Sequence, residues 1–525
     1  MKKIDDEIQL LLKEHNGNIR EILEENSRLD YLYALSEQRE LLLEWYDFDP
    51  EGELLQIGAD YGAMTGLFRT SVAQVTVLDE DANALRTVEL RYPGAANIRY
   101  ENGSLFDLKE ERAEGFDYVV FAGTLQAPYE EQLQAAKALL KPDGVLIVAV
   151  PNALGMKYFS GTADEANAMT KVQLAQLLPG GRFYYPMPDY RTPVSIYSDQ
   201  YLPKKGDITR VTPAYDYPRY HMMDMGQKFD TACEAGLFDL YANSYLVFWS
   251  SIPERLENGE DPIYVKYNKT RKEVFQIKTC ICEAKKEGGR RRYVEKAALS
   301  LAGSAHIDSF RKKEEELMQQ HRVLKVASPE YRPDRNSAFF PYLEGQTWAE
   351  KLGQQISGGQ LPLEALSQAL DQVYDIRPEF RSSFVRTEEF DEVFGQGLCE
   401  EELALLGQDT ACRVSNIDAL FENMLLTEDG IYCLDYEWVF LFPVPEHFVK
   451  YRILYYFYEQ YSSVMKQLSL DQILSAFGIT PEMAEVYRKM EVNFQNYVHG
   501  ENQQLYLGNY MVYSRGIKEI RQTES

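Results

Sequence analysis

The sequence has few cysteines, and their spacing argues against two common kinds of cysteine-based site. No C-x-x-C pair occurs among the six cysteines. Paired C-x-x-C spacings are typical of structural zinc sites, and many cysteines in a short chain are typical of disulfide-linked domains. The sequence therefore predicts neither a zinc site nor a disulfide framework, and it predicts reduced thiols at Cys233, Cys280, Cys282, Cys399, Cys412 and Cys433.

The sequence also lacks a long hydrophobic run. It contains no stretch of about 18 apolar residues, the length needed to span a bilayer. Its opening residues, MKKIDDEIQLLLKEHNG, are charged and amphipathic where a secretory signal would be apolar. We therefore expect a cytoplasmic protein without a transmembrane segment, with any contact with the inner membrane made through its partners.

Basic residues are scarce relative to acidic ones. Lys plus Arg total 55, Asp plus Glu total 82, and the formal net charge is -27. A net negative charge repels the phosphate backbone of nucleic acids, so we do not expect a nucleic-acid partner. Apolar residues make up 45% of the chain and aromatic residues 13%, which predicts a folded protein rather than a disordered one.

The chain is too long for one hydrophobic core, because single cores stop growing near about 250 to 300 residues. Residues 1–50 have apolar residues at helical spacing and predict an N-terminal helical cap. From 51 to 255, short apolar runs such as QVTVLD and GVLIVAV alternate with helical segments, which predicts a doubly wound parallel sheet of the α/β class. The polar segment RLENGEDP is typical of a linker, and antiparallel strands followed by helices predict a further domain over 261–525.

The segment LLQIGADYGAMTG has the pattern of a strand, a tight turn and a helix start. Gly58 and Gly62 allow a turn whose backbone N–H groups can receive an anionic ligand. Asp79 ends the next apolar run, at the spacing at which an acid accepts the hydroxyl groups of a ribose. Gly103 and Ser104 follow the third run, where they would lie near an adenine.

This order of motifs resembles the class I S-adenosylmethionine-dependent methyltransferases. The resemblance implies a Rossmann-like domain over 51–255 with S-adenosylmethionine as its cofactor. It also implies that Gly58 and Gly62 shape the cofactor loop, that Asp79 binds the ribose and that Ser104, next to Gly103, binds the adenine edge.

The chain departs from this family at two positions. Gln56 stands where the family usually has an acidic residue, and Asp60 replaces the middle glycine of the cofactor loop. The Asp60 carboxylate could oppose the carboxylate of the cofactor, turn outward, or contact the cofactor's ammonium group. In the first case Asp60→Gly should tighten cofactor binding. A Rossmann-like sheet that has lost its cofactor is the alternative interpretation.

The segment SNIDALFENMLLTEDGIYCLDYEWVF carries the residue types that phosphoryl transfer needs. Asp418 and Asn423 form the pattern D-x-x-x-x-N, and a predicted hairpin then leads to Asp435. Such a set supplies an acid that orients and deprotonates an acceptor hydroxyl, together with an amide oxygen and a second acid that hold magnesium. We therefore predict Asp418 as the catalytic residue and Asn423 and Asp435 as metal ligands.

This order resembles the protein kinases and, more closely, the aminoglycoside-type phosphotransferases. The resemblance implies a bilobal α+β kinase-like domain that binds ATP with Mg²⁺. It implies that Lys296, on the strand RRYVEKAAL, holds the nucleotide phosphates, that a glutamate of the next helix, with Glu315 as the candidate, pairs with this lysine, and that Glu344 lies in the hinge.

The glycine-rich nucleotide loop of these families is missing here. The corresponding turn is YNKTRKEVF, which contains no glycine. Polar side chains such as Asn268 and Thr270 could replace backbone N–H groups as phosphate contacts, or the domain could bind nucleotide poorly. A kinase-like domain without activity therefore stays open as an alternative.

The two motif sets in this order are similar to the bifunctional methyltransferase/kinase family that terminates O-antigen chains in bacteria. The resemblance implies an enzyme that modifies the terminal sugar of a cell-surface polysaccharide, with a glycan or nucleotide-sugar-derived acceptor and a glycosyltransferase as a possible partner. The alternative is a scaffold in a glycan-synthesis complex, with a degenerate methyltransferase domain and at most the kinase domain active.

Overall fold

The structure is a computed structural model that describes residues 2–111, 115–208, 220–256, 260–286, 289–465, 468–510 and 515–516. The chain forms two compact units. Unit 1 comprises Met1–Thr270, Lys278–Arg291 and Asn502–Ser525, and unit 2 comprises Arg271–Ile277 and Arg292–Glu501. The predicted linker, 255–262, lies partly outside the described residues, because 257–259 are not described.

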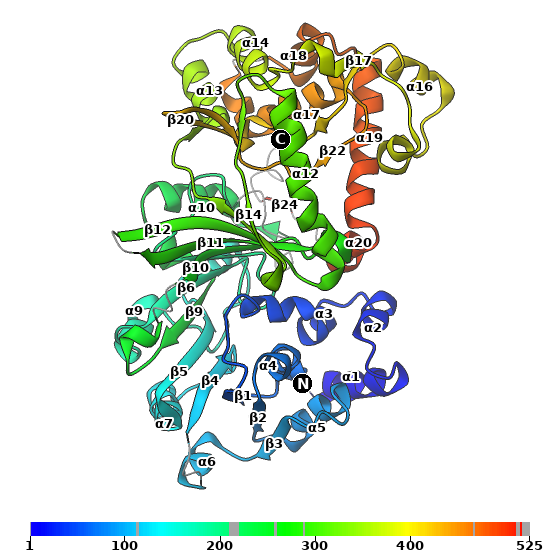
Figure 1. The fold of residues 1–525 in the computed structure, drawn as a ribbon. Helices are drawn as coiled ribbons and strands as arrows, with labels where there is room; N and C mark the ends of the chain where they lie inside the picture. The colour runs from blue at the N-terminus through cyan, green and yellow to red at the C-terminus, as the bar shows by residue number, and fades with distance from the viewer. Residues whose placement is uncertain are drawn as a thin grey trace, which may run out of the picture. The chain divides into compact units, whose positions relative to one another are not determined.

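Unit 1 begins with short helices. They are α1 (Lys2–Glu14), α2 (Ile19–Glu25), α3 (Leu29–Leu35) and the 3-10 helix η1 (Glu37–Leu42). Helix α1 packs beside α5 (Ala82–Arg91), as Figure 1 shows. The apolar side chains that the sequence spaces at helical intervals, among them Ile8, Leu12 and Leu32, are buried in a small core of their own.

Most of unit 1 is a mixed sheet whose parallel part has the order β3-β2-β1-β4-β5. The strand order reverses between β1 and β4, as expected for a doubly wound sheet. The central strands are buried along most of their length, which explains their continuous apolar runs. The parallel strands are β1 (Glu53–Ile57), β2 (Gln74–Asp79), β3 (Ile98–Asn102), β4 (Phe116–Ala122) and β5 (Leu140–Pro151).

Antiparallel strands continue this sheet beyond β5 in the order β9, β6, β7, β10 and β11. These strands are β6 (Arg182–Met187), β7 (Ser195–Ser198), β9 (Ser244–Trp249), β10 (Glu260–Tyr267) and β11 (Ile277–Lys286). The other α-helices and strands of unit 1 are α4 (Thr65–Ser71), α6 (Leu105–Glu111), α7 (Tyr129–Ala138), α8 (Met156–Ser160), α9 (Lys171–Leu177), β8 (Tyr220–His221), α10 (Met225–Glu234), α11 (Phe238–Tyr241), α20 (Asn502–Tyr506) and β24 (Arg515–Gly516). The fold is thus mixed α/β with a Rossmann-like domain, as the sequence predicts.

Unit 2 begins with an antiparallel arrangement in which β15 pairs with both β12 and β14. Its core is formed mainly by helices, and the aromatic helix α17 contributes Phe448, Tyr451 and Phe457 to it. The strands are β12 (Gly289–Ala298), whose residues from Arg292 belong to unit 2, β13 (Lys325–Val326), β14 (Glu330–Arg332), β15 (Ser337–Pro341), β16 (Gln346–Thr347), β17 (Arg381–Ser383), β18 (Thr410–Cys412), β19 (Ser415–Asn416), β20 (Met424–Thr427), β21 (Gly430–Cys433), β22 (Val439–Phe440) and β23 (Val444–Pro445). The helices are α12 (Ser304–Gln320), α13 (Trp348–Ser357), α14 (Pro362–Val373), α15 (Glu388–Phe390), α16 (Glu400–Leu406), α17 (Glu446–Tyr461), α18 (Leu470–Ala476) and α19 (Pro481–His499).

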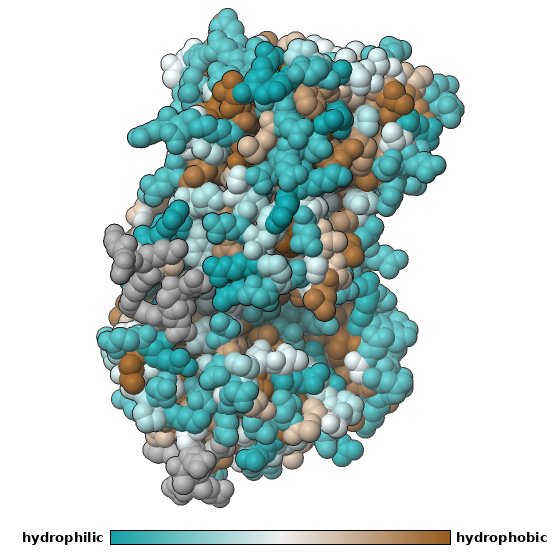
Figure 2. Space-filling view, in the orientation of Figure 1, coloured by the Kyte–Doolittle hydropathy of each residue, from teal (hydrophilic) through white to brown (hydrophobic). Residues whose placement is uncertain are grey.

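Hydrophilic residues predominate on the face of the molecule shown in Figure 2, and hydrophobic residues occur among them in separate groups. The exposed large apolar side chains include Leu301 and Val323. Within the described part of the chain, no helix is both long and apolar enough to cross a membrane. The six cysteines form no disulfide with one another.

Candidate functional site

The turn between β1 and α4 adopts a backbone that few sequences can form. Gly58 and Gly62 have φ angles of 86° and 73°, and the two residues Asp60 and Tyr61 also have positive φ, at 40° and 55°. A Cβ atom at Gly58 would lie 2.5 Å from Cγ2 of Thr124. Glycine is therefore required at Gly58 both by its backbone angle and by the space available.

Gln56 explains one departure from the family pattern, because its side chain supports this turn. The residue is 3% exposed, and its amide nitrogen donates to the carbonyl oxygen of Gly58 at 3.0 Å. Its amide oxygen accepts a hydrogen bond of 2.8 Å from the hydroxyl of Thr65 at the start of α4. A carboxylate could accept the Thr65 bond but could not donate to Gly58, so the amide serves both ends of the turn.

Asp60 forms an ion pair with a residue from the N-terminal helices. Its Oδ2 atom lies 2.6 Å from Nη2 of Arg39 in η1, and Arg39 is 4% exposed. The guanidinium thus compensates the carboxylate that replaces the family's middle glycine. Removal of Asp60 would leave the buried Arg39 guanidinium without its partner, which opposes the tighter cofactor binding expected of Asp60→Gly. That expectation stays a prediction.

The other predicted residues lie at the carboxyl ends of neighbouring strands. The Asp79 carboxylate accepts from the backbone N–H of Ala59 at 2.8 Å, which links the end of β2 to the turn after β1. The backbone N–H of Gly103 donates to the carbonyl of Asp79 at 3.2 Å. Ser104 donates to Asp107 at 2.6 Å at the start of α6. A Cβ atom at Gly103 would meet no atom within 4 Å, so this position borders open space.

A group of charged side chains, which sequence reasoning missed, lies near the carboxyl ends of β4, β5 and β6. The Lys157 ammonium contacts Glu165 at 2.6 Å and Asp189 at 3.3 Å, and Arg191 also pairs with both carboxylates. Tyr190 stands between Asp189 and Arg191 in the sequence and is 4% exposed. Its ring would lie 2.4 Å from a Cβ atom at Gly123. The only hint in the sequence is the aromatic and charged composition of the segment FYYPMPDYRTP.

Unit 2 brings four of the predicted phosphotransfer residues together. The Lys296 ammonium on β12 lies 2.7 Å from Oδ1 of Asp435, which follows the β20–β21 hairpin. The Asn423 amide donates to the backbone carbonyl of Asp418 at 2.9 Å, which leaves its own carbonyl oxygen as an acceptor. One Asp418 oxygen accepts from the backbone N–H of Trp438 at 2.9 Å.

The charges of these residues influence one another. Burial raises the pKa of Asp418 to about 7, the negative charge of Asp435 adds to this shift, and the nearby Arg452 opposes it. Burial lowers the pKa of the Lys296 ammonium, but the carboxylates of Asp435 and Glu437 outweigh burial and raise it overall. The cluster therefore holds a charged lysine beside an acid that titrates near neutral pH.

The structure does not pair the predicted glutamate of α12 with Lys296. Lys296 pairs with Asp435, and Glu315 is exposed on α12 instead of pairing with the lysine. The two neighbouring glutamates of α12 have other partners as well, because Glu314 accepts from Ser328 and Glu316 pairs with Arg413 at 2.6 Å. Glu344 is exposed between β15 and β16.

Glu437 is a buried residue that sequence reasoning missed, two positions after Asp435. Its carboxylate lies 2.8 Å from Nε2 of His306 and forms an ion pair with Arg271, from the turn that has no glycine. Burial opposes the ionised form of Glu437, yet Arg271 and His306 hold its pKa well below the usual range. The acidic residue is visible in the sequence, but its distant partners are not.

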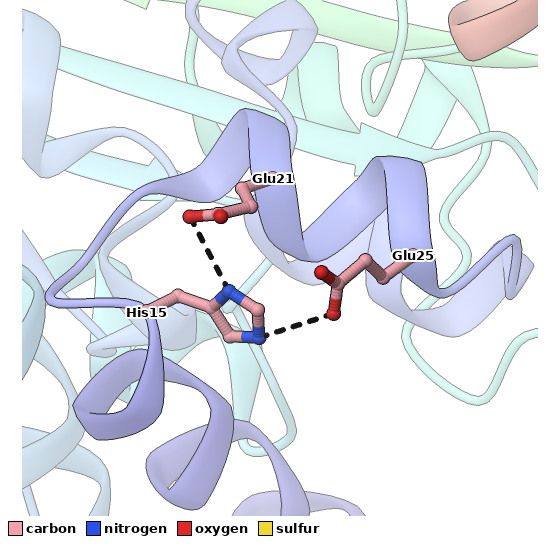
Figure 3. A group of neighbouring side chains, drawn as sticks. All are labelled: His15, Glu21 and Glu25. Carbon is pink, nitrogen blue, oxygen red and sulfur yellow. Dashed lines mark ion pairs between the residues drawn. The ribbon is translucent and has the colours of Figure 1, made fainter.

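One further group of possible metal ligands occurs among the described residues, in the N-terminal helices. His15 lies between Glu21 and Glu25, which approach its two ring nitrogens at 3.4 and 3.5 Å (Figure 3). A metal ion coordinates one imidazole nitrogen, whereas here the carboxylates approach opposite nitrogens. The side chains of Glu21 and Glu25 are also 51% and 59% exposed, so the arrangement fits a surface ion-pair group better than a metal site.

We expect Asp418 to make the stability of unit 2 depend on pH. A carboxyl whose pKa is raised in the folded state stabilises the fold below its unfolded pKa, near about 4, and this contribution is lost as the pH rises toward about 7. The free energy of unfolding of the metal-free wild type, minus that of Asp418→Asn, should therefore fall by about 1.4 kcal/mol per pH unit across this window. Denaturant unfolding of both proteins between about pH 5 and 7 measures this difference, and a constant difference would contradict the assignment.

Comparison with known proteins identifies one part of the chain. A sequence model described as a methyltransferase domain matches residues 55–148, which run from β1 into β5. Comparison with curated proteins gives no match.

Solved structures that are similar cover only a minor part of the chain. The N-methyltransferase NodS from Bradyrhizobium japonicum WM9, in complex with S-adenosyl-L-homocysteine, is 20% identical over 26% of this chain and 74% of that chain, with a TM-score of 0.21. A precorrin 8w decarboxylase from Methanobacterium thermoautotrophicum is 22% identical over 22% of this chain and 62% of that chain, with a TM-score of 0.20. This chain therefore covers less than two thirds of the decarboxylase. The match of residues 55–148 indicates a methyltransferase-like domain in this part of the chain.

Proposed function

We propose that the protein is a bifunctional enzyme, in which unit 1 transfers a methyl group from S-adenosylmethionine and unit 2 transfers a phosphoryl group from ATP with Mg²⁺. The methyltransferase-domain match and the turn after β1 support the first activity. The observation that best supports phosphoryl transfer by unit 2 is the contact of Lys296 with Asp435, because these residues are 139 positions apart in the sequence.

In unit 1, the residues at the ends of β1, β2 and β3 fit a nucleoside with an amino-acid end. The turn from Gly58 to Gly62 would receive the amino-acid end, Asp79 would accept the ribose hydroxyls, and Ser104 would face the adenine. S-adenosylmethionine, when bound, supplies an activated methyl group. The protein's part is then to orient the acceptor atom in line with that group and to exclude water.

In unit 2, the donor set fits a magnesium ion. Magnesium prefers oxygen ligands, and Asp435 offers a carboxylate whose side chain is 41% exposed. Asn423 has its amide carbonyl oxygen available, since its nitrogen is the atom bonded to Asp418. Lys296 would contact the nucleotide phosphates, and Asp418 would accept the proton of the acceptor hydroxyl.

The acceptor follows from the resemblance of the two motif sets to the enzymes that terminate bacterial O-antigen chains. We infer that both units act on a cell-surface polysaccharide or its terminal sugar, so that the acceptor is a glycan or a nucleotide-sugar-derived molecule. A glycosyltransferase that makes the polymer is the partner this role implies.

Ligand-dependent thermal unfolding tests both activities at once. S-adenosylmethionine alone and ATP with Mg²⁺ alone should each raise the midpoint of unfolding, because a ligand at about 100 times its Kd stabilises the folded state by about 2.7 kcal/mol. ATP with EDTA in place of Mg²⁺ is the control for metal dependence. If only ATP with Mg²⁺ stabilises the protein, the alternative of a scaffold with a degenerate methyltransferase domain is favoured. If neither ligand does, both activities are contradicted.

A further inference from the structure

Asp60 lies at the point of the sheet where ligands of doubly wound folds bind. It follows β1, and the strand order of the parallel sheet reverses between β1 and β4. Gly58, two positions earlier, packs against Thr124, which follows β4. The turn that carries Asp60 is thus held beside the ends of both strands.

One oxygen atom of the Asp60 carboxylate is bound to Arg39, and the other can accept hydrogen bonds from a ligand. Its Oδ2 atom accepts from Arg39 at 2.6 Å, and among the described residues no other hydrogen bond to this carboxylate is found. The Asp60 side chain is 26% exposed, whereas that of Arg39 is 4% exposed. Because an ionised carboxylate offers about four lone-pair sites, Oδ1 can accept hydrogen bonds from a ligand without breaking the pair with Arg39.

Arg39 is also held by a second hydrogen bond, which it donates to α3. Its Nη1 atom donates to the backbone carbonyl of Tyr33 at 2.7 Å. The Arg191 guanidinium lies over the rings of both Tyr33 and Tyr190, 5.5 and 5.1 Å from their centroids, so the segment that holds Arg39 lies near Tyr190. Tyr190 packs in turn on Gly123, directly after β4.

We propose that Asp60 receives the ammonium group of the cofactor's amino-acid end, and that Arg39 is the positioning residue that holds the carboxylate for it. An ammonium group brings three donors and a positive charge, which form strong, charge-assisted hydrogen bonds with a carboxylate. The residue that breaks the glycine pattern would thus contribute to cofactor recognition. This inference rests on the proposed binding of S-adenosylmethionine by unit 1.

Calorimetry with two ligands tests the proposal. S-adenosylhomocysteine carries the amino-acid end, and 5′-methylthioadenosine has the same nucleoside without it. Asp60→Asn should weaken binding of S-adenosylhomocysteine by about 10- to 100-fold and change binding of 5′-methylthioadenosine by less than about twofold. Asparagine is the suitable replacement because it keeps the size of the side chain and tolerates a positive φ.

Three further variants make the outcome decisive. Arg39→Met should show the same selective loss as Asp60→Asn, Asp79→Ala should weaken both ligands because both contain the ribose, and Asp6→Asn, exposed on α1, should weaken neither. An equal loss of both ligands in Asp60→Asn, or no loss of S-adenosylhomocysteine, would overturn the inference while leaving the cofactor site intact. Failure of the wild type to bind either ligand would instead overturn the proposed methyltransferase function, and this inference with it.

Discussion

Replacing Asp435 with alanine is expected to abolish magnesium-dependent binding of ATP by unit 2 and, with it, phosphoryl transfer. Asp435 supplies the most exposed carboxylate of the cluster and lies 2.7 Å from the Lys296 ammonium. Without it, the metal would lose its charged ligand and the lysine would lose its partner. Calorimetric titration of ATP with and without Mg²⁺ measures the effect, and unchanged affinity in Asp435→Ala would refute the assignment.

A second pair of variants separates loss of the site from loss of the fold. Lys296 is buried and loses its ion-pair partner in Asp435→Ala, so this variant is expected to destabilise unit 2 as well. Asp435→Asn keeps the shape and a hydrogen-bond acceptor, and it should fold while still losing the metal. Asp429→Asn, in the turn of the same hairpin, is the matched control and should bind ATP as the wild type does.

Asp418→Asn should give a different result from Asp435→Asn. Asp418 contacts the backbone of Trp438 and not Lys296, so its replacement should leave ATP binding intact. Removal of a general base lowers the rate by about 10² to 10⁴-fold, and the transfer step should fall by that factor. Loss of ATP affinity in Asp418→Asn would show that this residue binds metal rather than the acceptor.

The parallel sheet could be predicted from the sequence because its strands are continuous apolar runs between helical segments. β2 and β5 cover QVTVLD and GVLIVAV, Asp79 is the last residue of β2, and Gly103 directly follows β3. The interaction of Asp60 with Arg39 could not be predicted in this way. The two residues are 21 positions apart, and a 3-10 helix without a regular apolar period gives no indication of which side chain faces the sheet.

Helical phase explains the incorrect pairing expected in unit 2. The buried residues of α12 include Phe310, Lys313 and Leu317, which follow one another at intervals of three and four and form the inward-facing side. Glu315 lies off that side, so it cannot reach Lys296. The sequence KKEEE contains a lysine as the inward-facing residue, and Lys313 indeed donates to the backbone carbonyl of Glu437. The expected glutamate came from the resemblance to kinases, and the rarity of buried charged residues gives no indication that Lys313 faces inward.

Gly58→Ala is expected to remove cofactor binding by unit 1 and to destabilise it. The backbone at Gly58 has φ 86°, a region that costs an alanine about 1 to 2 kcal/mol. The new Cβ would lie 2.5 and 2.7 Å from two Thr124 carbons, and overpacking of this kind costs about 1 to 3 kcal/mol more. Relief of this contact would require the turn to move away from β4, and its N–H groups would no longer point to the same place.

Gly103→Ala is the matched control for this prediction, because it adds the same methyl group at another predicted cofactor position. A Cβ there would meet no atom within 4 Å, so the free energy of unfolding should change by less than about 0.5 kcal/mol. Denaturant unfolding and calorimetry with S-adenosylhomocysteine should therefore show loss of both stability and binding in Gly58→Ala. In Gly103→Ala the free energy of unfolding should stay unchanged. Weaker binding of S-adenosylhomocysteine by this variant would indicate that the ligand lies against the end of β3. Wild-type affinity in Gly58→Ala would contradict the role of this turn, since no cofactor that depends on its backbone could tolerate the displacement.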